Sequence, residues 1–201
     1  IAEALGWRGP DVVVAPIASG AMFTKLAKGF AQLADVGLID RRPIRFVGGQ
    51  AAGCGPVATA WETGEPVRPV RTPDTIVRSL AIGNPADGEA SVELARATGG
   101  SIEGIEDRDT AAAIRDVARL EGIYAETAGG VTVAAAEAAR RRGVIRDGDE
   151  VVAILSGNGL KTPDARLLGA DDGPATPGRG GLAPILRPRL SDFESWLETA
   201  R

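Results

Sequence analysis

The sequence predicts an α/β fold in which an open, mostly parallel sheet carries helices on both faces. Four short and almost entirely apolar runs alternate with longer segments of helical periodicity. Strands that are covered on both faces appear as continuous apolar runs, and regular alternation with helices is typical of parallel sheets. The expected strands are residues 12–16, 45–50, 101–105 and 151–155.

The first strand leads into an amphipathic helix. Its apolar residues recur at helical spacing on one face, and they are Phe23, Leu26, Ala27, Phe30, Leu33 and Ala34. Ahead of the first strand, Ile1–Leu5 resembles the last turns of a helix closed by Gly6. We therefore expect this chain to be a piece of a longer protein. After the second strand, residues 64–74 form a loop that its prolines make stiff.

Three further helices are expected between the second and fourth strands. The first spans Asp87–Thr98 and ends at Gly99. The second starts at a cap formed by Asp107 or Asp109, ends at Gly122 and directs three residues inward, which are Ile114, Val117 and Ala118. The third is a helix of small residues, Gly130–Arg142, whose three final arginines form a solvated end that complements the helix dipole.

The chain closes with a connection and one more helix. Residues 162–189 are rich in Gly and Pro and predict a surface connection. Ser191 and Glu194 have the spacing of a capping box, which starts a terminal helix carrying Phe193, Trp196 and Leu197. We expect that helix to pack back onto the main domain. The predicted division is a large domain at 1–165 and a connection with its helix at 166–201.

Composition excludes several classes of protein. The 201 residues carry a net charge of −4 with scattered arginines, which does not provide the basic face that nucleic acids require. No apolar run reaches the length of a membrane span. The chain has no histidine, so hydrolases with a catalytic histidine and the usual zinc sites are excluded, and we expect no metal. The single Cys54 lies among Gly and Ala and is expected to be a small buried residue.

The loop after the first strand is a candidate anion site. It comprises Ala18, Ser19, Gly20, Ala21 and Met22, directly before the first helix. Small residues let backbone N–H groups approach a ligand, and the positive end of the helix favours a phosphate. The loop matches neither the P-loop nor the dinucleotide pattern. The alternative, a tight turn without a ligand, stays open on these residues alone.

The turn after the fourth strand offers a hydroxyl at Ser156, followed by Gly157, Asn158 and Gly159. Ligands bind at the carboxyl ends of strands in open parallel sheets. A hydroxyl there can pair with the nitrogen of an aromatic ring without adding a full charge. The alternative is a serine that caps its own turn, with Asn158 and Gly159 in positions that tolerate positive φ.

A carbonyl cofactor would need a lysine amine, and the chain has three lysines. Lys25 and Lys28 lie opposite the apolar face of the first helix and are expected to point to solvent. Lys161 follows the glycine turn, and it alone has an approach to a site at the strand ends. We do not expect it to be catalytic.

Five blocks, taken in order, resemble the threonine synthase family of pyridoxal-phosphate enzymes, which has the tryptophan synthase β-like fold (fold type II). The blocks are residues 14–25, 49–54, 79–88, 125–130 and 156–161. The resemblance covers about residues 1–165, with Thr127 standing where the family usually has proline. It implies that this chain is the carboxyl-terminal half of such an enzyme.

The resemblance implies roles for particular residues. The loop Ala18–Met22 would hold the phosphate of pyridoxal 5′-phosphate, and Ser156 would face the pyridine nitrogen, leaving it largely unprotonated. Ala81, Ile82 and Gly83 would line the ring and substrate side, and Glu126 would support the pocket from below. Family members convert O-phospho-L-homoserine and water to threonine and phosphate. A cytoplasmic homodimer is implied for the complete enzyme, with no nucleic-acid or membrane partner.

Two parts of the family pattern lie in the amino-terminal half, which is expected to be missing. They are the Schiff-base lysine in its short motif and the small domain that closes over the substrate. No catalytic residue is therefore expected here, and the chain alone is expected to be inactive. Two alternatives stay open: another fold-type II enzyme, such as a threonine dehydratase or cysteate synthase, or a non-catalytic binding or scaffold remnant.

Overall fold

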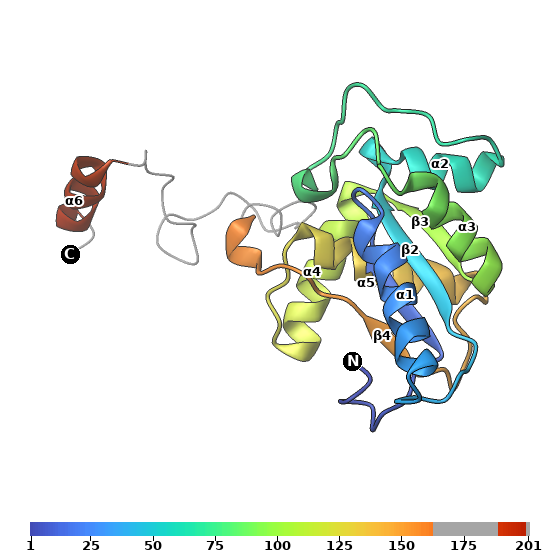
Figure 1. Ribbon diagram of the computed structural model, residues 1–201. Helices are drawn as coiled ribbons and strands as arrows, with labels where there is room; N and C mark the ends of the chain where they lie inside the picture. Colours follow the sequence, from blue (N-terminus) through green and yellow to red (C-terminus); the bar gives the residue numbers. More distant parts are fainter. Residues whose placement is uncertain (163–188, 200–201) are drawn as a thin grey trace. The chain divides into compact units, whose positions relative to one another are not determined.

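The computed structural model of the protein describes residues 1–162 and 189–199 (Figure 1). The chain divides into two compact units, Ile1–Ala170 and Asp171–Arg201. In the second unit the described element is helix α6, Leu190–Thr199, which begins one residue before the expected cap at Ser191. The predicted boundary at residue 165 and most of the predicted connection lie outside the described residues. None of the described helices is long and apolar enough to cross a membrane.

The first unit contains a four-stranded sheet in which every pair of neighbours is parallel. The strands are β1 (Val12–Pro16), β2 (Arg45–Ala51), β3 (Ser101–Ile105) and β4 (Val151–Ala153). Their spatial order is β3-β2-β1-β4, so the chain moves outward from β1 to β3 and then returns to the other side of β1. The predicted parallel α/β architecture is confirmed.

Helices cover both faces of the sheet, as predicted (Figure 1). On one face lie α1 (Ala21–Asp35), α2 (Pro56–Thr63) and α3 (Gly88–Thr98), and on the other lie α4 (Asp107–Glu121) and α5 (Thr127–Arg141). The helices change face where the strand order reverses, because parallel crossovers keep one hand. Side chains of β1 alternate accordingly: Val13 packs in the α1 core and Val14 in the α5 core.

The fourth strand differs from the prediction of a buried strand over 151–155. It ends at Ala153, and Val151 is 37% exposed. Within the described residues β4 pairs on one side only, with β1, and it therefore keeps an open edge. One further hydrogen bond, from Ile154 N to Val14 O at 2.9 Å, carries the pairing past the strand end.

The starts of two helices also differ from the prediction. Glu106 is the N-cap residue of α4, so the expected cap at Asp107 or Asp109 is wrong. The Asp107 carboxylate instead accepts hydrogen bonds from Thr75 Oγ1 at 2.5 Å and from Ile76 N at 2.9 Å. Helix α5 begins at Thr127 rather than at residue 130.

Other local expectations are partly confirmed. Ala118 is exposed rather than directed inward, whereas Ile114 and Val117 are buried as predicted. Ile1–Leu5 forms hydrogen-bonded turns instead of a helix. Its closure is nevertheless of the expected kind, because Gly6 has φ +70° and Trp7 N donates to Ala2 O at 2.8 Å.

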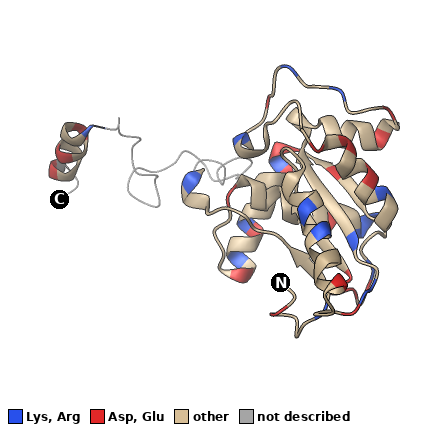
Figure 2. Cartoon of the chain, in the orientation of Figure 1, with Lys and Arg blue, Asp and Glu red and all other residues tan. Residues whose placement is uncertain are grey.

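Charged residues of both signs are spread over the first unit (Figure 2). The three arginines at the end of α5 have exposed side chains, as expected of a solvated helix end. Each forms an ion pair: Arg140 with Asp147, Arg141 with Glu137, and Arg142 with Glu103.

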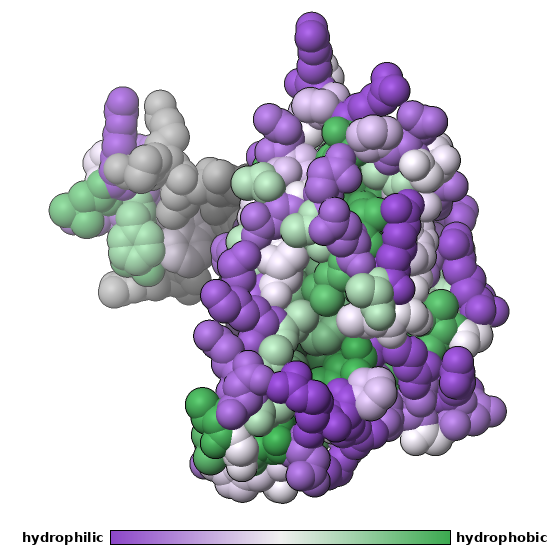
Figure 3. Space-filling model, turned by 45° about the vertical axis from the view of Figure 1, so that its right-hand side comes forward, coloured by the Kyte–Doolittle hydropathy of each residue, from purple (hydrophilic) through white to green (hydrophobic). Residues whose placement is uncertain are grey.

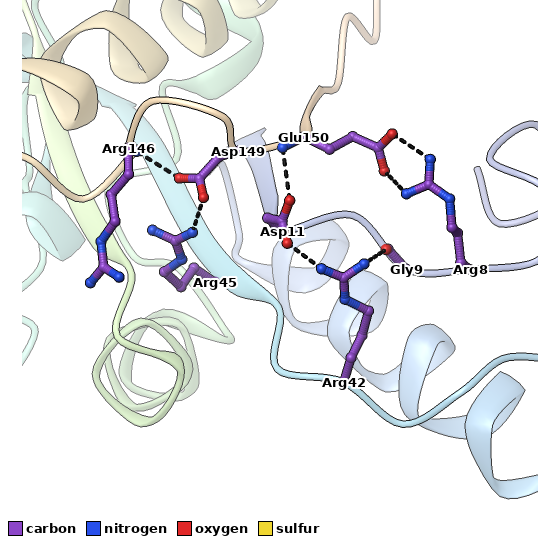
Figure 4. Close-up of polar contacts among 8 residues, drawn as sticks. All are labelled: Arg8, Gly9, Asp11, Arg42, Arg45, Arg146, Asp149 and Glu150. Carbon is purple, nitrogen blue, oxygen red and sulfur yellow. Dashed lines mark hydrogen bonds and ion pairs between the residues drawn. The ribbon is translucent and has the colours of Figure 1, made fainter.

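Ion pairs tie the segment before β4 to the amino-terminal end of the sheet (Figure 4). Asp149 accepts from Arg146 N at 2.6 Å and from Arg45 Nη2 at 2.6 Å, and Arg45 begins β2. The hydrogen bond from the Arg146 N–H, followed by that from the Arg45 guanidinium, lowers the pKa of Asp149 below its ordinary value of 3.8. These contacts connect β4 to the strand two places away.

A second group of contacts lies beside the first (Figure 4). Asp11 accepts from Glu150 N at 2.8 Å and from the Arg42 guanidinium. The Glu150 carboxylate accepts hydrogen bonds from both terminal nitrogens of Arg8. These hydrogen bonds raise the pKa of the Arg8 guanidinium above its ordinary value. Residues that precede β1, β2 and β4 are thus held together at the amino-terminal ends of these strands.

The Asp149 contacts predict an acid-dependent contribution to stability. Because the pKa of Asp149 is lowered in the fold, its carboxylate stabilises the fold above pH 3.8, and that contribution is lost as the pH falls through the folded-state pKa. Asp149→Asn should lower the urea midpoint at pH 7, with the difference from wild type shrinking below pH 3.8. Asp147→Asn is the control, since its side chain is exposed. Equal losses in both variants would contradict this account.

The start of α5 offers a stabilising substitution. Thr127 is the first helical residue, and its buried hydroxyl has no hydrogen-bond partner among the described residues. Glu126 before it has φ −67° and ψ 166°, an extended conformation that suits a residue before proline. Thr127→Pro should raise the free energy of unfolding by about 0.4–1 kcal/mol. Thr127→Ala, which only removes the hydroxyl, is the control in urea unfolding; a proline variant less stable than the alanine variant would refute the prediction.

Candidate functional site

A pocket of about 250 Å³ lies past the carboxyl ends of β1 and β4. These two strands flank the point where the strand order reverses, which is where open parallel sheets bind ligands. Residues from four parts of the chain line the pocket: the loop after β1, the turn before residue 81, the start of α5 and the turn after β4. They are Pro16, Ala18, Ser19, Gly20, Met22, Ser79, Leu80, Glu126, Ala128, Ser156 and Lys161.

The amino-terminal end of α1 forms one wall of the pocket. Gly20 is the N-cap residue and has φ +88°, a left-handed conformation that favours glycine. A Cβ at this position would lie 2.6 Å from both Asp87 O and Ser91 Oγ, so no other residue fits without a shift of the backbone. No acidic residue lies in the first turn of α1 among the described residues, and the positive end of the helix therefore remains available to an anion.

Asp87 attaches this loop to α3. Its backbone N–H donates to Ser19 O at 2.8 Å, and its carboxylate accepts from Lys25 Nζ and Thr24 Oγ1, each at 3.0 Å. The hydrogen bond from Lys25, and then that from Thr24, lowers the pKa of Asp87 below its ordinary value of 3.8. Asp87, at the start of α3, therefore binds both the loop after β1 and the first turns of α1.

The turn after β4 forms another wall of the pocket. Asn158, rather than Ser156, caps the following 3-10 turn Gly159–Lys161, because its Oδ1 accepts from Leu160 N at 2.9 Å. The Ser156 hydroxyl lines the pocket and has no hydrogen-bond partner among the described residues. The self-capping alternative for Ser156 is therefore wrong in this part of the structure, and the hydroxyl is available to a ligand.

The two glycines of this turn are required by close contacts and not by positive φ. A Cβ on Gly157 would lie 2.0 Å from Glu126 Oε2, and one on Gly159 would lie 2.4 Å from the ring of Tyr124. Backbone hydrogen bonds join the same segments, from Glu126 N to Gly157 O at 3.0 Å and from Gly159 N to Tyr124 O at 2.8 Å. The turn thus lies directly against the segment that starts α5.

Glu126 contributes a buried carboxylate to the pocket. Its side chain is 4% exposed, and Lys161 Nζ lies 3.5 Å from its Oε2. The Lys161 side chain is 64% exposed. The ion pair therefore joins a buried anion to a cation at the surface, across the turn that carries Ser156.

Most of the residues predicted for the site meet in this pocket, and four do not line it. Ala18, Ser19, Gly20, Met22, Glu126 and Ser156 are lining residues. Ala21 is the first residue of α1 but is absent from the lining. Ala81, Ile82 and Gly83 follow the lining residues Ser79 and Leu80, and Gly83 O instead accepts from Val70 N at 2.9 Å.

Lys161 lines the pocket, in agreement with its expected approach to the site, and the other lining residues were not predicted. Pro16, Leu80 and Ala128 are apolar residues at element ends and carry no chemical signal in the sequence. These three residues and Ser79 lie within the five blocks that carry the family resemblance, and those blocks were the signal available for them. Lys25 and Lys28 have exposed side chains, as expected. Cys54 is fully buried, which raises the pKa of its thiol and disfavours the reactive thiolate.

Comparison with known proteins identifies the family. Residues 1–157 match the family of pyridoxal-phosphate dependent enzymes. The chain belongs to this family. The predicted cofactor class and fold type are thereby confirmed.

Among curated proteins, the chain is similar to threonine synthases. It is 35% identical to that of Methanosarcina acetivorans over 81% of this chain, and 36% identical to that of Mycobacterium tuberculosis H37Rv over 83%. These matches cover 40% and 44% of the two relatives. The chain therefore spans about two fifths of the length of the curated relatives that it matches.

Solved structures show the same fold at low sequence identity. An L-serine ammonia-lyase from Rhizomucor miehei aligns over 83% of this chain and 52% of that chain, with a TM-score of 0.62 at 18% identity. The processed form of threonine deaminase isoform 2 from Solanum lycopersicum aligns over 80% of this chain and 45% of that chain, with a TM-score of 0.60 at 21% identity.

The residues of the pocket fit the cofactor of the pyridoxal-phosphate dependent family. The start of α1 has no acidic residue in its first turn among the described residues, which leaves the positive helix end open to a phosphate. On another wall, Ser156 offers a hydroxyl without a described partner. Each of these walls thus supplies the kind of group that a phosphate or a ring nitrogen requires.

The close contact at Gly20 predicts a measurable loss of stability. Gly20→Ala meets both an unfavourable φ and the backbone oxygen of Asp87. Gly37→Ala in the turn after α1 is the matched control, because Gly37 has φ +74° but no atom within 4 Å of an added Cβ. The control should cost about 1–2 kcal/mol, and Gly20→Ala should cost a further 1–3 kcal/mol or so from overpacking. Equal urea midpoints for the two variants would contradict the close packing.

Proposed function

We propose that these 201 residues are the cofactor-holding part of a threonine synthase. The complete enzyme would convert O-phospho-L-homoserine and water to L-threonine and phosphate, and it would act as a homodimer. The observation that carries the proposal is the pocket at the β1–β4 reversal, where the start of α1 faces the Ser156 turn. The similarity to threonine synthases supports the choice of substrate.

The two walls of the pocket would hold opposite ends of the cofactor. The loop Ala18–Met22 would bind the phosphate through backbone N–H groups and the positive end of α1. Ser156 would meet the pyridine nitrogen with a neutral hydroxyl, which does not favour the protonated ring. Leu80 and Ala128 would exclude water beside the ring, since both are buried.

When bound, pyridoxal phosphate supplies an electron sink for chemistry at the α-carbon of an amino acid. The residues described here bind and orient this group. The lysine that holds it covalently would come from a part of the protein outside these 201 residues. Lys25 pairs with Asp87, Lys28 is exposed, and Lys161 pairs with Glu126, which leaves none of the three placed as a free amine in the pocket.

A chimera tests this function directly. The amino-terminal part of the Methanosarcina acetivorans relative would be fused to this chain, in place of the matching 40% of that protein. The chimera should release phosphate from O-phospho-L-homoserine and form threonine. Ser156→Ala in the chimera should lower kcat at least about tenfold, equivalent to about 1.4 kcal/mol of transition-state stabilisation. Gly29→Ala is the control, because an added Cβ there meets no atom within 4 Å.

Other outcomes would favour the alternatives. A chimera that deaminates threonine without releasing phosphate from phosphohomoserine would indicate a threonine dehydratase. A folded chimera without bound cofactor would indicate a non-catalytic remnant. An adduct with pyridoxal phosphate at Lys161 of the isolated chain that borohydride reduces to a stable amine, together with consumption of phosphohomoserine, would contradict the proposed division of roles.

A further inference from the structure

Glu126 is a buried carboxylate whose charge the roles proposed above do not use. It is the N-cap residue of α5, yet its side chain forms no capping hydrogen bond. Among the described residues the carboxylate has one polar contact, with Lys161 Nζ at 3.5 Å. An ionised carboxylate has about four acceptor positions. Glu126 therefore retains most of its capacity to accept hydrogen bonds at the edge of the pocket.

The position of this carboxylate is defined by the turn that carries Ser156. Glu126 Oε2 lies 2.0 Å from the place where a Gly157 Cβ would be, so the carboxylate rests against the residue next to Ser156. Both Glu126 and Ser156 line the same pocket. A neutral hydroxyl and an anion thus both line the pocket, and the anion packs against the turn that carries the hydroxyl.

Whether a pyridine nitrogen meets the Ser156 hydroxyl or the Glu126 carboxylate would decide its charge. A carboxylate beside such a nitrogen favours its protonated form, because an opposite charge within about 4–6 Å stabilises the charged state. A hydroxyl adds no charge and leaves the nitrogen neutral. Among the described residues that line the pocket, Glu126 carries the only carboxylate, so without a competing cation it would be the anion offered to the ring.

Lys161 supplies that cation. It ends the 3-10 turn that follows Ser156, and its amine reaches back across the turn to Glu126. Most of the Lys161 side chain is exposed to water, so forming the ion pair costs little desolvation of its ammonium group. Burial of the carboxylate alone would be unfavourable, and the ammonium group offsets this cost.

We propose that Lys161 is a positioning residue that holds Glu126 away from the ring nitrogen and leaves this nitrogen to Ser156. The inference rests on the proposed function, since it assumes that the ring lies against Ser156. It assigns Lys161 a role in setting the protonation of the cofactor rather than in covalent attachment. The pair would thereby favour the chemistry of an unprotonated pyridine ring.

The test measures the ring nitrogen itself. Pyridoxal phosphate labelled with ¹⁵N would be added to the full chain, and the ¹⁵N chemical shift reports whether the nitrogen is protonated. Lys161→Met should raise the ratio of protonated to unprotonated ring at least tenfold at pH 7. Lys161→Arg keeps the charge and should stay at the wild-type ratio. Lys161→Met combined with Glu126→Gln should return to that ratio, because the competing anion is gone.

A second measurement needs no cofactor. Lys161→Met should lower the urea midpoint of the chain, and adding Glu126→Gln should recover at least half of that loss, since the buried charge no longer lacks a partner. Independent, additive losses would show that the two side chains do not act as a pair and would overturn the inference.

The outcomes separate this inference from the proposed function. Wild-type chain that fails to bind labelled cofactor contradicts both. Chain that binds it with an unprotonated nitrogen in wild type and in Lys161→Met alike overturns the role of Lys161 and leaves the proposed function standing. Protonation that appears in Lys161→Met and disappears in the double variant supports the inference.

Discussion

The parallel pairing of β4 with β1 is the interaction on which the pocket depends. Val12 pairs with Val151 and Val14 with Ala153, and a hydrogen bond from Ile154 N to Val14 O continues the register. This pairing joins two segments about 140 residues apart in the sequence. Because side chains alternate along a strand, a shift by one residue would turn the residues that follow β4 to the other face. At the amino-terminal ends of these two strands, the hydrogen bond from Glu150 N to Asp11 joins the same segments, and the ion pair of Asp149 with Arg45 ties them to β2 (Figure 4).

Close packing at small residues then shapes both walls of the pocket. Gly20 is required by its left-handed φ and by its contact with Asp87, whereas Gly157 and Gly159 are required by the side chains of Glu126 and Tyr124. Elsewhere on the surface, apolar side chains lie in a strip between polar ones (Figure 3). The pocket is built from backbone that other segments approach closely, and the polar side chains that line it are those of Ser19, Ser79, Glu126, Ser156 and Lys161.

Local patterns in the sequence predicted the elements better than their arrangement. Four apolar runs marked the four strands, but the place of β4 beside β1 is a long-range property that periodicity does not report. Asp107 has the appearance of a helix cap, yet Thr75 and Ile76 take its carboxylate, which is a tertiary contact. Glu126 and Lys161 lie 35 residues apart, and no spacing rule joins them. The roles of Ala81, Ile82 and Gly83, which came from the resemblance, stay predictions.

The central claim is that the start of α1 and the Ser156 turn hold opposite ends of one pyridoxal phosphate molecule. Backbone amide shifts of the ¹⁵N-labelled chain, recorded with pyridoxal phosphate and with pyridoxal, test it most directly. The account predicts that pyridoxal phosphate shifts the amides of residues 19–22 and 156–159, and that pyridoxal, which lacks the phosphate, shifts the second group alone. Shifts confined to a second pocket, which the α1 residues Leu26, Gly29 and Phe30 help to line, or identical shifts with both compounds, would contradict it.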